Sequence, residues 1–321
     1  MIYTQEELIE NALLYFKRKD FSLGYRTLLD AALNTDSEKI FVKVLDFVEK
    51  YENESKDDKS SLLSLFEECC IAVKSIKIES ENLMGKTILK GQNITKIYNK
   101  GRFTLGPVNV ELKKGDIFGL VGENGNGKTT LLKCASFLLK PDGGQVKLDN
   151  KTYALTKDKI TELYPKIGVM SQEFLLWPHL TNRKNIELPL KENDIKFDYK
   201  KLADNLNVID ILDKFPNDCS GGEKQRVSLL RQLSLGSEYL FLDEITSALD
   251  VEHIKIVEDI LLDLKKNNVS IFLITHSINL AKRLGDEFIF LDKGEVIERG
   301  EISKLEDPET QRLKSFLTYN F

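Results

Sequence analysis

Long apolar runs are missing from this sequence of 321 residues, and so is any ordered pattern of cysteines. No uninterrupted apolar stretch approaches the ~18–20 residues needed to cross a bilayer, so we expect that the chain does not span a membrane itself. The first residues, MIYTQEELIE, contain no basic segment followed by an apolar core, which predicts no secretory signal. The four cysteines form neither a C-x-x-C pair nor a disulfide framework, which is typical of reduced thiols in a cytoplasm.

Basic residues are scarce at one end of the chain. Residues 1–85 hold 17 Asp or Glu against 11 Lys or Arg, whereas the remainder is nearly balanced and the net charge is −5. Because a nucleic-acid backbone demands a positive surface, this distribution argues against a nucleic-acid partner. The 41% hydrophobic and 30% charged residues are ordinary for a globular protein, and we interpret the acidic excess as a solvated helical surface.

Helical periodicity dominates the first quarter of the sequence. Apolar residues recur at helical spacing over residues 4–19 and 21–33, and further helical patterns cover about residues 38–51 and 60–74. We predict a small all-α module with a linker over residues 1–85. Its first two helices resemble a single tetratricopeptide-like hairpin, a type of element that often presents a groove to a protein partner.

Residues 86–321 have a different texture and predict an α/β domain. Short β-branched and aromatic runs such as VNVELKKG and DIFGLVG come first, and helical patterns then alternate with apolar strands at 239–243 (YLFLD) and 270–275 (SIFLIT). Such alternation predicts parallel strands joined by helical crossovers.

The stretch GLVGENGNGKTTLLK contains a G-x-x-x-x-G-K-T phosphate loop between a predicted buried strand and a predicted helix. Its glycines allow several backbone N–H groups to face one anion, and the helix N-terminus adds a positive dipole. Lys128 would neutralise the β- and γ-phosphates, and the Thr129 hydroxyl would ligate Mg²⁺. The residues expected to contact the nucleotide are Gly122, Glu123, Asn124, Gly125, Asn126, Gly127, Lys128, Thr129 and Thr130.

Two later strands end in polar residues that suit the same chemistry. Asp243 and Glu244 follow the strand at 239–243, so that Asp243 can hold Mg²⁺ while Glu244 polarises an attacking water. His276 follows the strand at 270–275 and can bond a γ-phosphate oxygen in the transition state. Taken alone, two acids in a loop or one histidine after a strand would more often be structural, and it is their combination that carries the prediction.

In order along the chain, these segments resemble the motifs of ABC-type ATPases from about residue 88 to the C-terminus. GENGNGKTT corresponds to Walker A, SQE to the Q-loop, CSGGEKQR to the signature, YLFLDE to Walker B, SALD to the D-loop and TH to the switch. The resemblance implies a P-loop NTPase fold, with a parallel sheet core plus antiparallel β and α-helical subdomains. It also implies hydrolysis of ATP with Mg²⁺, a catalytic and metal-binding role for Gln172, and stacking of Tyr98 on adenine.

The same resemblance implies an obligatory partner. In this family two ATPase domains associate head to tail, so Ser220, Gly221 and Gly222 would contact ATP bound to a second chain, which we expect to be an identical one. Cys219 stands where the family usually has leucine, and Ile245 where it usually has proline. Neither replaces a group that touches phosphate, so we expect catalysis to be retained.

One half-site in a chain without a membrane span implies, if the protein serves a transporter, separate integral-membrane subunits and a place on the cytoplasmic face of the membrane when assembled. The segment EFLLWPHLTNRKNIELPL resembles the region that receives such a subunit, and the tail GEISKLEDPETQRLKSFL resembles that of polar amino-acid importer ATPases. The sequence also leaves open a soluble ABC ATPase that acts as a regulatory or assembly switch, with a partner bound by the N-terminal helices.

Overall fold

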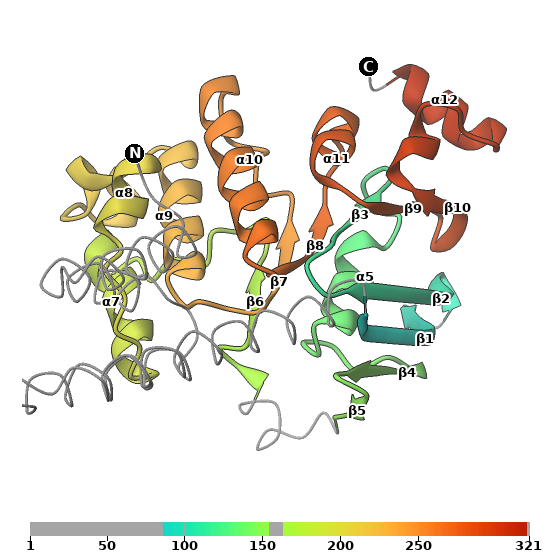
Figure 1. Ribbon diagram of the computed structural model, residues 1–321, viewed down its shortest axis with the longest axis horizontal. Helices are drawn as coiled ribbons and strands as arrows, with labels where there is room; N and C mark the ends of the chain where they lie inside the picture. Colours follow the sequence, from blue (N-terminus) through green and yellow to red (C-terminus); the bar gives the residue numbers. More distant parts are fainter. Residues whose placement is uncertain (1–85, 99–100, 154–162, 320–321) are drawn as a thin grey trace, which may run out of the picture. The chain divides into compact units, whose positions relative to one another are not determined.

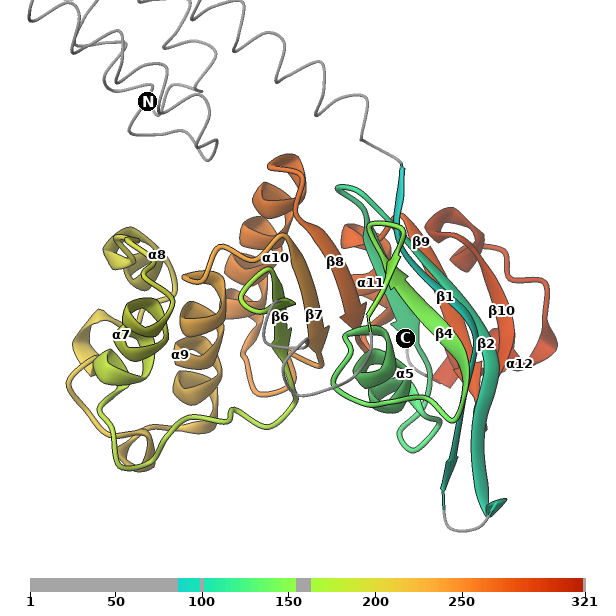
Figure 2. The same cartoon turned by 90° about the horizontal axis from the view of Figure 1, so that it is seen from below.

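The computed structural model describes residues 86–98, 101–153 and 163–319, which form two sheets and the helices that flank them (Figures 1 and 2). The all-α module predicted over residues 1–85 lies outside the described residues. The structure therefore bears on the predicted α/β domain alone.

A six-stranded sheet runs through the centre of this domain, in the order β10-β9-β3-β8-β7-β6. Its members are β3 (Ile117–Val121), β6 (Ile167–Met170), β7 (Tyr239–Asp243), β8 (Ser270–Ile274), β9 (Glu287–Asp292) and β10 (Glu295–Glu301). Neighbouring strands are parallel except for β9 and β10, which pair antiparallel. The strand predicted at 239–243 is confirmed as β7, and the one predicted at 270–275 as β8.

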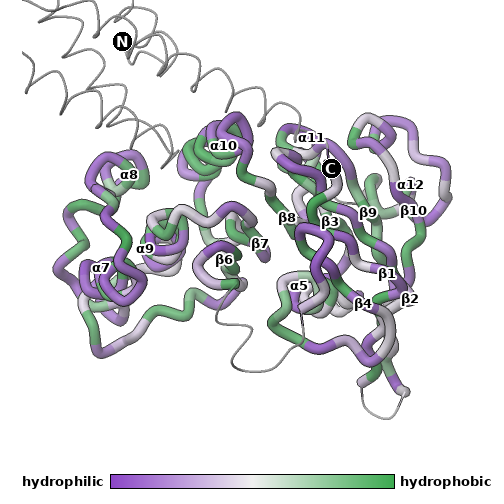
Figure 3. Tube along the Cα trace, turned by 60° about the horizontal axis from the view of Figure 1, so that its bottom comes forward, coloured by the Kyte–Doolittle hydropathy of each residue, from purple (hydrophilic) through white to green (hydrophobic). Residues whose placement is uncertain are grey.

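Both faces of the sheet are buried, which explains why its strands read as unbroken apolar runs. In β7, Tyr239 and Phe241 contribute to one hydrophobic core, whereas Leu240 and Leu242 contribute to another. This division follows from the strand itself, because successive side chains point to opposite faces. Figure 3 shows hydrophobic residues gathered along these central strands.

Helices cover the sheet and form a separate group beyond β6 (Figure 1). Side chains of Thr181, Ser220, Asp250 and Ser277 accept backbone hydrogen bonds at the N-termini of four of these helices, as expected for such caps. The helices are α5 (Lys128–Ala135), α7 (Asn182–Glu192), α8 (Lys200–Asn205), α9 (Gly221–Leu233), α10 (Val251–Lys266), α11 (Ile278–Leu284) and α12 (Gln311–Tyr319), with 3-10 turns at Ile209–Ile211, Pro216–Asp218 and Ile302–Leu305.

A second, antiparallel sheet has the strand order β2-β1-β4-β5. It consists of β1 (Thr87–Tyr98), β2 (Phe103–Lys113), β4 (Gly143–Leu148) and β5 (Lys151–Thr152). Apolar residues of β1, β2 and β4 share one core with α5 and with one face of the central sheet. This packing places α5, and the loop that precedes it, between the two sheets (Figure 2).

The described residues thus form a parallel core with an antiparallel β part and a helical part, as the sequence predicts. Within the ranges that the structure describes, no helix is both long enough and apolar enough to cross a bilayer.

Candidate functional site

The loop between β3 and α5 has the backbone that a phosphate loop requires. Gly122 and Gly127 have positive φ angles of 155° and 95°, and a Cβ added at Gly122 would lie 2.3 Å from the carbonyl oxygen of Leu291. Helix α5 begins without a side-chain cap. Since the first N–H groups of a helix have no partner within the helix, those of α5 are available to an anion.

The Lys128 side chain is buried beneath this loop. Its ammonium donates hydrogen bonds to the carbonyl oxygens of Gly122 (2.7 Å) and Glu123 (3.0 Å), and it lies 3.8 Å from a carboxylate oxygen of Glu244. Burial lowers the pKa of Lys128, and the carboxylates of Glu244 and Asp243 oppose that change. The positive charge is therefore fixed inside the loop and beside the strand that carries both acids.

Thr129 and Asp243 meet directly, although 114 positions separate them in the sequence. The Thr129 hydroxyl donates to Asp243 at 2.7 Å, and the Asp243 side chain is only 2% exposed. Burial raises the pKa of Asp243, while the bond from Thr129 counteracts it. A hydroxyl and a carboxylate are hard oxygen ligands, so this pair fits Mg²⁺.

Among the described residues, no group of three or more His, Cys, Asp or Glu side chains could bind a metal. These residues therefore do not form a magnesium site on their own. This agrees with the usual habit of Mg²⁺, which takes one or two carboxylates together with phosphate oxygens and water. The pair of Thr129 and Asp243 suits a metal that arrives with a nucleotide.

Glu244 lies at the centre of the remaining predicted residues. The Gln172 amide donates to its carboxylate at 3.0 Å, and Nδ1 of His276 lies 3.6 Å from it. Glu244 is 6% exposed and has a positive φ of 51°, an uncommon backbone conformation for a residue with a side chain. The structure thus brings Gln172 and His276 together on the predicted catalytic carboxylate. Gln172 was also predicted to bind the metal, but its side chain bonds to Glu244 and not to Thr129 or Asp243.

Tyr98 lies at the end of β1 with its side chain partly exposed. Its ring centroid is 6.4 Å from that of Phe103, at an interplanar angle of 42°. The neighbouring Ile97 is also exposed. An accessible aromatic ring supported by a second ring is suited to stacking on a flat base, which agrees with the adenine contact expected for Tyr98.

The signature segment forms the N-terminus of α9, apart from α5 and with β6 between them (Figures 1 and 2). Ser220 and Glu223 form a reciprocal capping box, in which the Ser220 hydroxyl accepts from the Glu223 N–H at 3.2 Å. In return the backbone N–H of Ser220 donates to the Glu223 carboxylate at 2.6 Å, and this bond holds the pKa of Glu223 below its usual range.

Gly222 has a packing reason to be glycine. A Cβ at Gly222 would lie 2.9 Å from the carbonyl oxygen of Ala248, which belongs to the predicted D-loop. Sequence reasoning assigned Gly222 to nucleotide contact alone, and the structure adds this close approach of two backbones.

The two unusual residues of the motifs, Cys219 and Ile245, are both buried in one hydrophobic core. The Cys219 thiol is buried, accepts from the Asn182 amide at 3.3 Å and lies 3.5 Å from the carbonyl oxygen of Phe215. Ile245 is buried in the same hydrophobic core. The polar neighbours of Cys219 give a physical reason for a thiol at a position otherwise suited to an apolar side chain.

The side chain of Asn126 bonds within the protein. Its amide donates to Asp292 (2.9 Å) and to the carbonyl oxygen of Leu291 (3.4 Å). Asn126 therefore anchors the phosphate loop to the end of β9, and Asp292 is a site residue that sequence reasoning missed. A signal was present, since Asp292 ends the apolar run FIFLD much as Asp243 ends YLFLD.

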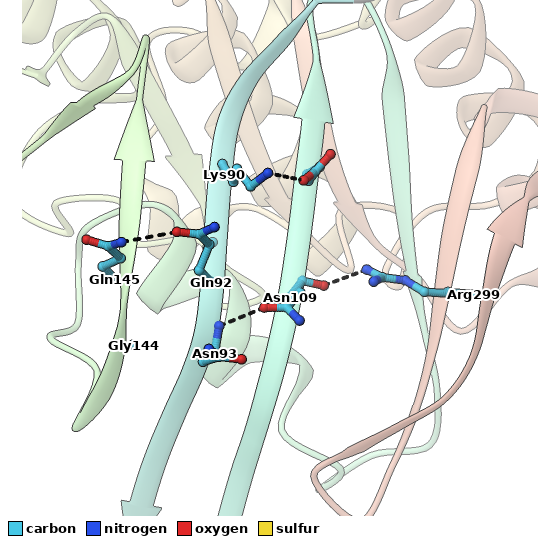
Figure 4. Close-up of a pocket in the computed structure, with 9 residues that line it drawn as sticks. Lys90, Gln92, Asn93, Asn109, Gly144, Gln145 and Arg299 are labelled. Carbon is cyan, nitrogen blue, oxygen red and sulfur yellow. Dashed lines mark hydrogen bonds and ion pairs between the residues drawn. The ribbon is translucent and has the colours of Figure 1, made fainter.

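A pocket of about 670 Å³ lies on the antiparallel sheet, away from the phosphate loop, and residues of β1, β2, β4 and β10 line it (Figure 4). Its polar groups bond to one another: Gln145 to Gln92, Lys90 to Glu111, and Arg299 to the carbonyl oxygen of Asn109. None of the residues predicted to bind nucleotide lines it.

Comparisons with known proteins agree with these observations. A family model described as ABC transporter matches residues 105–247. The arginine transport ATP-binding protein ArtP of Haemophilus influenzae is 31% identical over 242 residues, which cover 72% of this chain and 99% of the relative. The methionine import ATP-binding protein MetN 1 of Bacillus licheniformis is 36% identical over 243 residues, covering 70% of this chain and 71% of that protein.

Solved structures agree in the same way. The dimeric post-hydrolysis structure of the ATP-binding cassette MJ0796, bound to ADP and Pi, shares 31% sequence identity with this chain at a TM-score of 0.61. The similarity covers 67% of this chain and 99% of the cassette.

Proposed function

Because the chain belongs to the ABC transporter family of ATP-binding subunits, we propose that it hydrolyses Mg-ATP and so energises transport through separate transmembrane subunits. One observation carries the proposal: Lys128, Thr129, Gln172, Asp243, Glu244 and His276 come from distant segments and form one connected cluster. Charged groups of both signs are buried there at the carboxyl ends of parallel strands, where α/β sheets bind their ligands.

Binding of ATP depends on the loop and α5. The N–H groups of the loop and of the first turn of α5 hold the phosphate oxygens, and Lys128 neutralises the β- and γ-phosphates. For this, Lys128 exchanges its bonds to the carbonyl oxygens of Gly122 and Glu123 for bonds to phosphate. Tyr98 offers its ring to adenine, and Thr129 with Asp243 hold the Mg²⁺, which neutralises charge on the phosphates.

Hydrolysis depends on Glu244 and its neighbours. Glu244 orients a water molecule and accepts its proton while the water oxygen bonds to the γ-phosphorus and the bond to the β-phosphate oxygen breaks, leaving ADP and phosphate. Gln172 holds the Glu244 carboxylate in place. His276 stabilises the negative charge that develops on the γ-phosphate.

A second copy of the chain completes the site in this proposal. The signature lies apart from the phosphate loop of its own chain (Figures 1 and 2), which supports contact of Ser220 and its glycines with ATP bound to another chain. ATP then joins two chains and its hydrolysis releases them, because the contacts with ATP and with ADP differ in free energy. The dimeric cassette structure among the relatives supports this arrangement.

Transport of an amino acid is the finer part of the proposal. The relatives ArtP and MetN 1 are named for arginine transport and methionine import, and the predicted importer-type tail contains the helix α12. Leu175 and Trp177 are exposed beside the helical part, and the Arg231 guanidinium lies 5.3 Å from the Trp177 ring centroid. This apolar surface is suited to a transmembrane subunit. The alternative of a soluble switch depended on residues 1–85, which lie outside the described residues.

Purification of the tagged chain from detergent-solubilised native membranes tests the proposal. We expect transmembrane subunits to co-purify and the complex to hydrolyse ATP only with Mg²⁺. The variant Lys128→Ala should assemble into the same complex but bind ATP weakly and turn it over slowly, because the buried ammonium that neutralises the phosphates is lost.

Two outcomes would contradict separate parts of the proposal. A chain recovered only in the soluble fraction with a soluble partner would contradict transport. Unchanged ATP affinity in Lys128→Ala would contradict the role of the phosphate loop.

A further inference from the structure

The C-terminal helix contacts the phosphate loop through one side chain. Arg312 of α12 lies 2.9 Å from the carboxylate of Glu123, a residue of the loop. Its guanidinium also donates two hydrogen bonds to Asp292, at 2.9 and 3.1 Å. Asp292 in turn accepts from Asn126, a second residue of the loop. Arg312 is thus joined to the loop both directly and through Asp292.

Arg312 is presented from a fixed helix. Leu313, Phe316 and Leu317 of α12 are buried in one cluster with Val121, which directly precedes the loop. The start of the helix is held as well, because the Glu298 carboxylate accepts from the N–H groups of Glu309 and Thr310. The backbone that carries Arg312 is therefore held in place, and the planar guanidinium loses less side-chain freedom per hydrogen bond than an ammonium would.

The two carboxylates present an electrostatic difficulty that Arg312 removes. Glu123 and Asp292 place negative charge on and beside a loop whose proposed ligand is a polyanion. Asp292 is charged at neutral pH, since the paired guanidinium holds the pKa of its carboxyl below the usual range. Its side chain is 10% exposed, that of Arg312 is 37% exposed and that of Glu123 is 52% exposed. Solvent therefore screens the charge on Asp292 less than that on Glu123.

We propose that Arg312 is a positioning residue of the nucleotide site, which neutralises Glu123 and Asp292 so that the phosphate loop can accept the phosphates of ATP. The inference rests on the proposed function, because it assumes that ATP binds at this loop. It makes α12 a part of the binding site, although neither sequence patterns nor motif spacing connect the tail with the loop.

Equilibrium binding of ATP and ADP to the purified full-length chain tests this inference. At low ionic strength we expect Arg312→Ala to weaken ATP binding about two- to fivefold, the range of a partly screened charge contact. ADP, with one phosphate fewer, should be affected less. Once ATP is saturating, turnover should be unchanged, because Arg312 contacts none of the groups assigned to hydrolysis. The effect should shrink as salt is added.

Three further variants distinguish neutralisation of the two carboxylates from a role of Arg312 in holding α12 against the loop. Arg312→Lys keeps the charge and should restore part of the affinity. Arg312→Ala combined with Glu123→Gln removes one of the unpaired carboxylates and should bind ATP more tightly than Arg312→Ala alone. Lys314→Ala, which removes a positive charge from an exposed position of the same helix, should leave the affinity unchanged.

The inference is overturned if Arg312→Ala binds ATP as the wild type does, if Lys314→Ala weakens binding equally, or if Glu123→Gln brings no recovery. A wild-type chain that binds no ATP would instead overturn the proposed function, and this inference with it. If Arg312→Ala does not fold, Arg312→Gln, which keeps a polar side chain without the charge, takes its place, and wild-type ATP affinity in Arg312→Gln overturns the inference.

Discussion

At the scale of single residues, the site depends on acids that are buried beside one another. Asp243 and Glu244 are adjacent and almost completely buried, and burying charge destabilises a fold unless the charge is paired. Thr129 and Lys128 supply part of that compensation. The remainder is expected from Mg²⁺, so this site favours ligand binding at some expense of stability.

The variant Asp243→Asn tests this conflict. In the folded chain, burial raises the pKa of Asp243 above the ordinary value of 3.8, which applies to the unfolded chain. At a pH between the unfolded and the folded pKa, the folded chain keeps a proton that the unfolded chain has released. The stability of the fold therefore falls as pH rises through that window, and it stays lower above it. Without nucleotide and Mg²⁺, we expect Asp243→Asn to melt at a higher temperature than wild type at pH 7, although it should hydrolyse little ATP.

Thermal unfolding followed from about pH 4 to pH 7 provides the measurement, and the advantage of Asp243→Asn should shrink toward the acid end as the wild-type carboxyl becomes protonated. An asparagine can still accept the hydrogen bond from Thr129, so that contact serves as an internal control. A variant that is less stable than wild type at pH 7 would contradict the account.

The sequence predicted where most of these residues lie, but not what every side chain does. Motif spacing fixes Lys128, Thr129 and Asp243 because they flank a short loop and end a strand. Asn126 anchors to Asp292, and Gly222 approaches Ala248, and these contacts join segments far apart in the chain. Local patterns carry no information on such pairs. The roles assigned in catalysis stay predictions.

At the scale of elements, two helix N-termini have opposite arrangements. Gly127 precedes helix α5 and supplies no side-chain cap, whereas Ser220 precedes α9 and caps it in a capping box. The first leaves its N–H groups to a ligand. The second satisfies part of its own N–H groups through Ser220 and Glu223. The CSGGEKQR segment is thus a capped helix start, and its contact with another chain stays a proposal.

Substitutions at Ser220 should separate these two properties. Ser220→Ala removes the cap and should destabilise the chain by about 1 kcal/mol. Ser220→Asp keeps an acceptor for the Glu223 N–H and favours the positive end of the helix, so its loss of stability should be smaller. Its negative charge, however, would face the γ-phosphate of ATP on the second chain and should nearly abolish hydrolysis.

Urea unfolding of both variants measures the loss of stability, which should be larger in Ser220→Ala. ATPase assays measure hydrolysis, which should be lower in Ser220→Asp. Hydrolysis at the wild-type rate in Ser220→Asp would mean that Ser220 does not face a phosphate.

The elements themselves were largely predictable. Strands β7 and β8 follow from five-residue apolar runs, and α5 from the loop that precedes it. The order of the strands was not predictable in the same way, because β3 lies between β8 and β9, which come more than 140 residues later. Such pairing depends on which apolar faces fit together, and the sequence pattern records only that each strand is buried.

At the scale of the whole molecule, our proposal is that one chain holds two incomplete halves of a site. The phosphate loop with its carboxylates lies between the two sheets, and the signature lies in the helical part beyond β6 (Figures 1 and 2). Family membership supplies the link between them, since related cassettes form dimers. The central claim is therefore that ATP holds two copies of this chain together.

The most direct measurement of this claim is the mass of Glu244→Gln in solution, by size-exclusion chromatography with light scattering. The glutamine keeps an oxygen that can accept from Gln172, but it cannot accept the proton of water, so turnover should fall by about a hundredfold or more. We predict a monomer without nucleotide and a dimer with ATP, whereas Lys128→Ala should stay monomeric. A Glu244→Gln chain that binds ATP and remains a monomer would contradict the account.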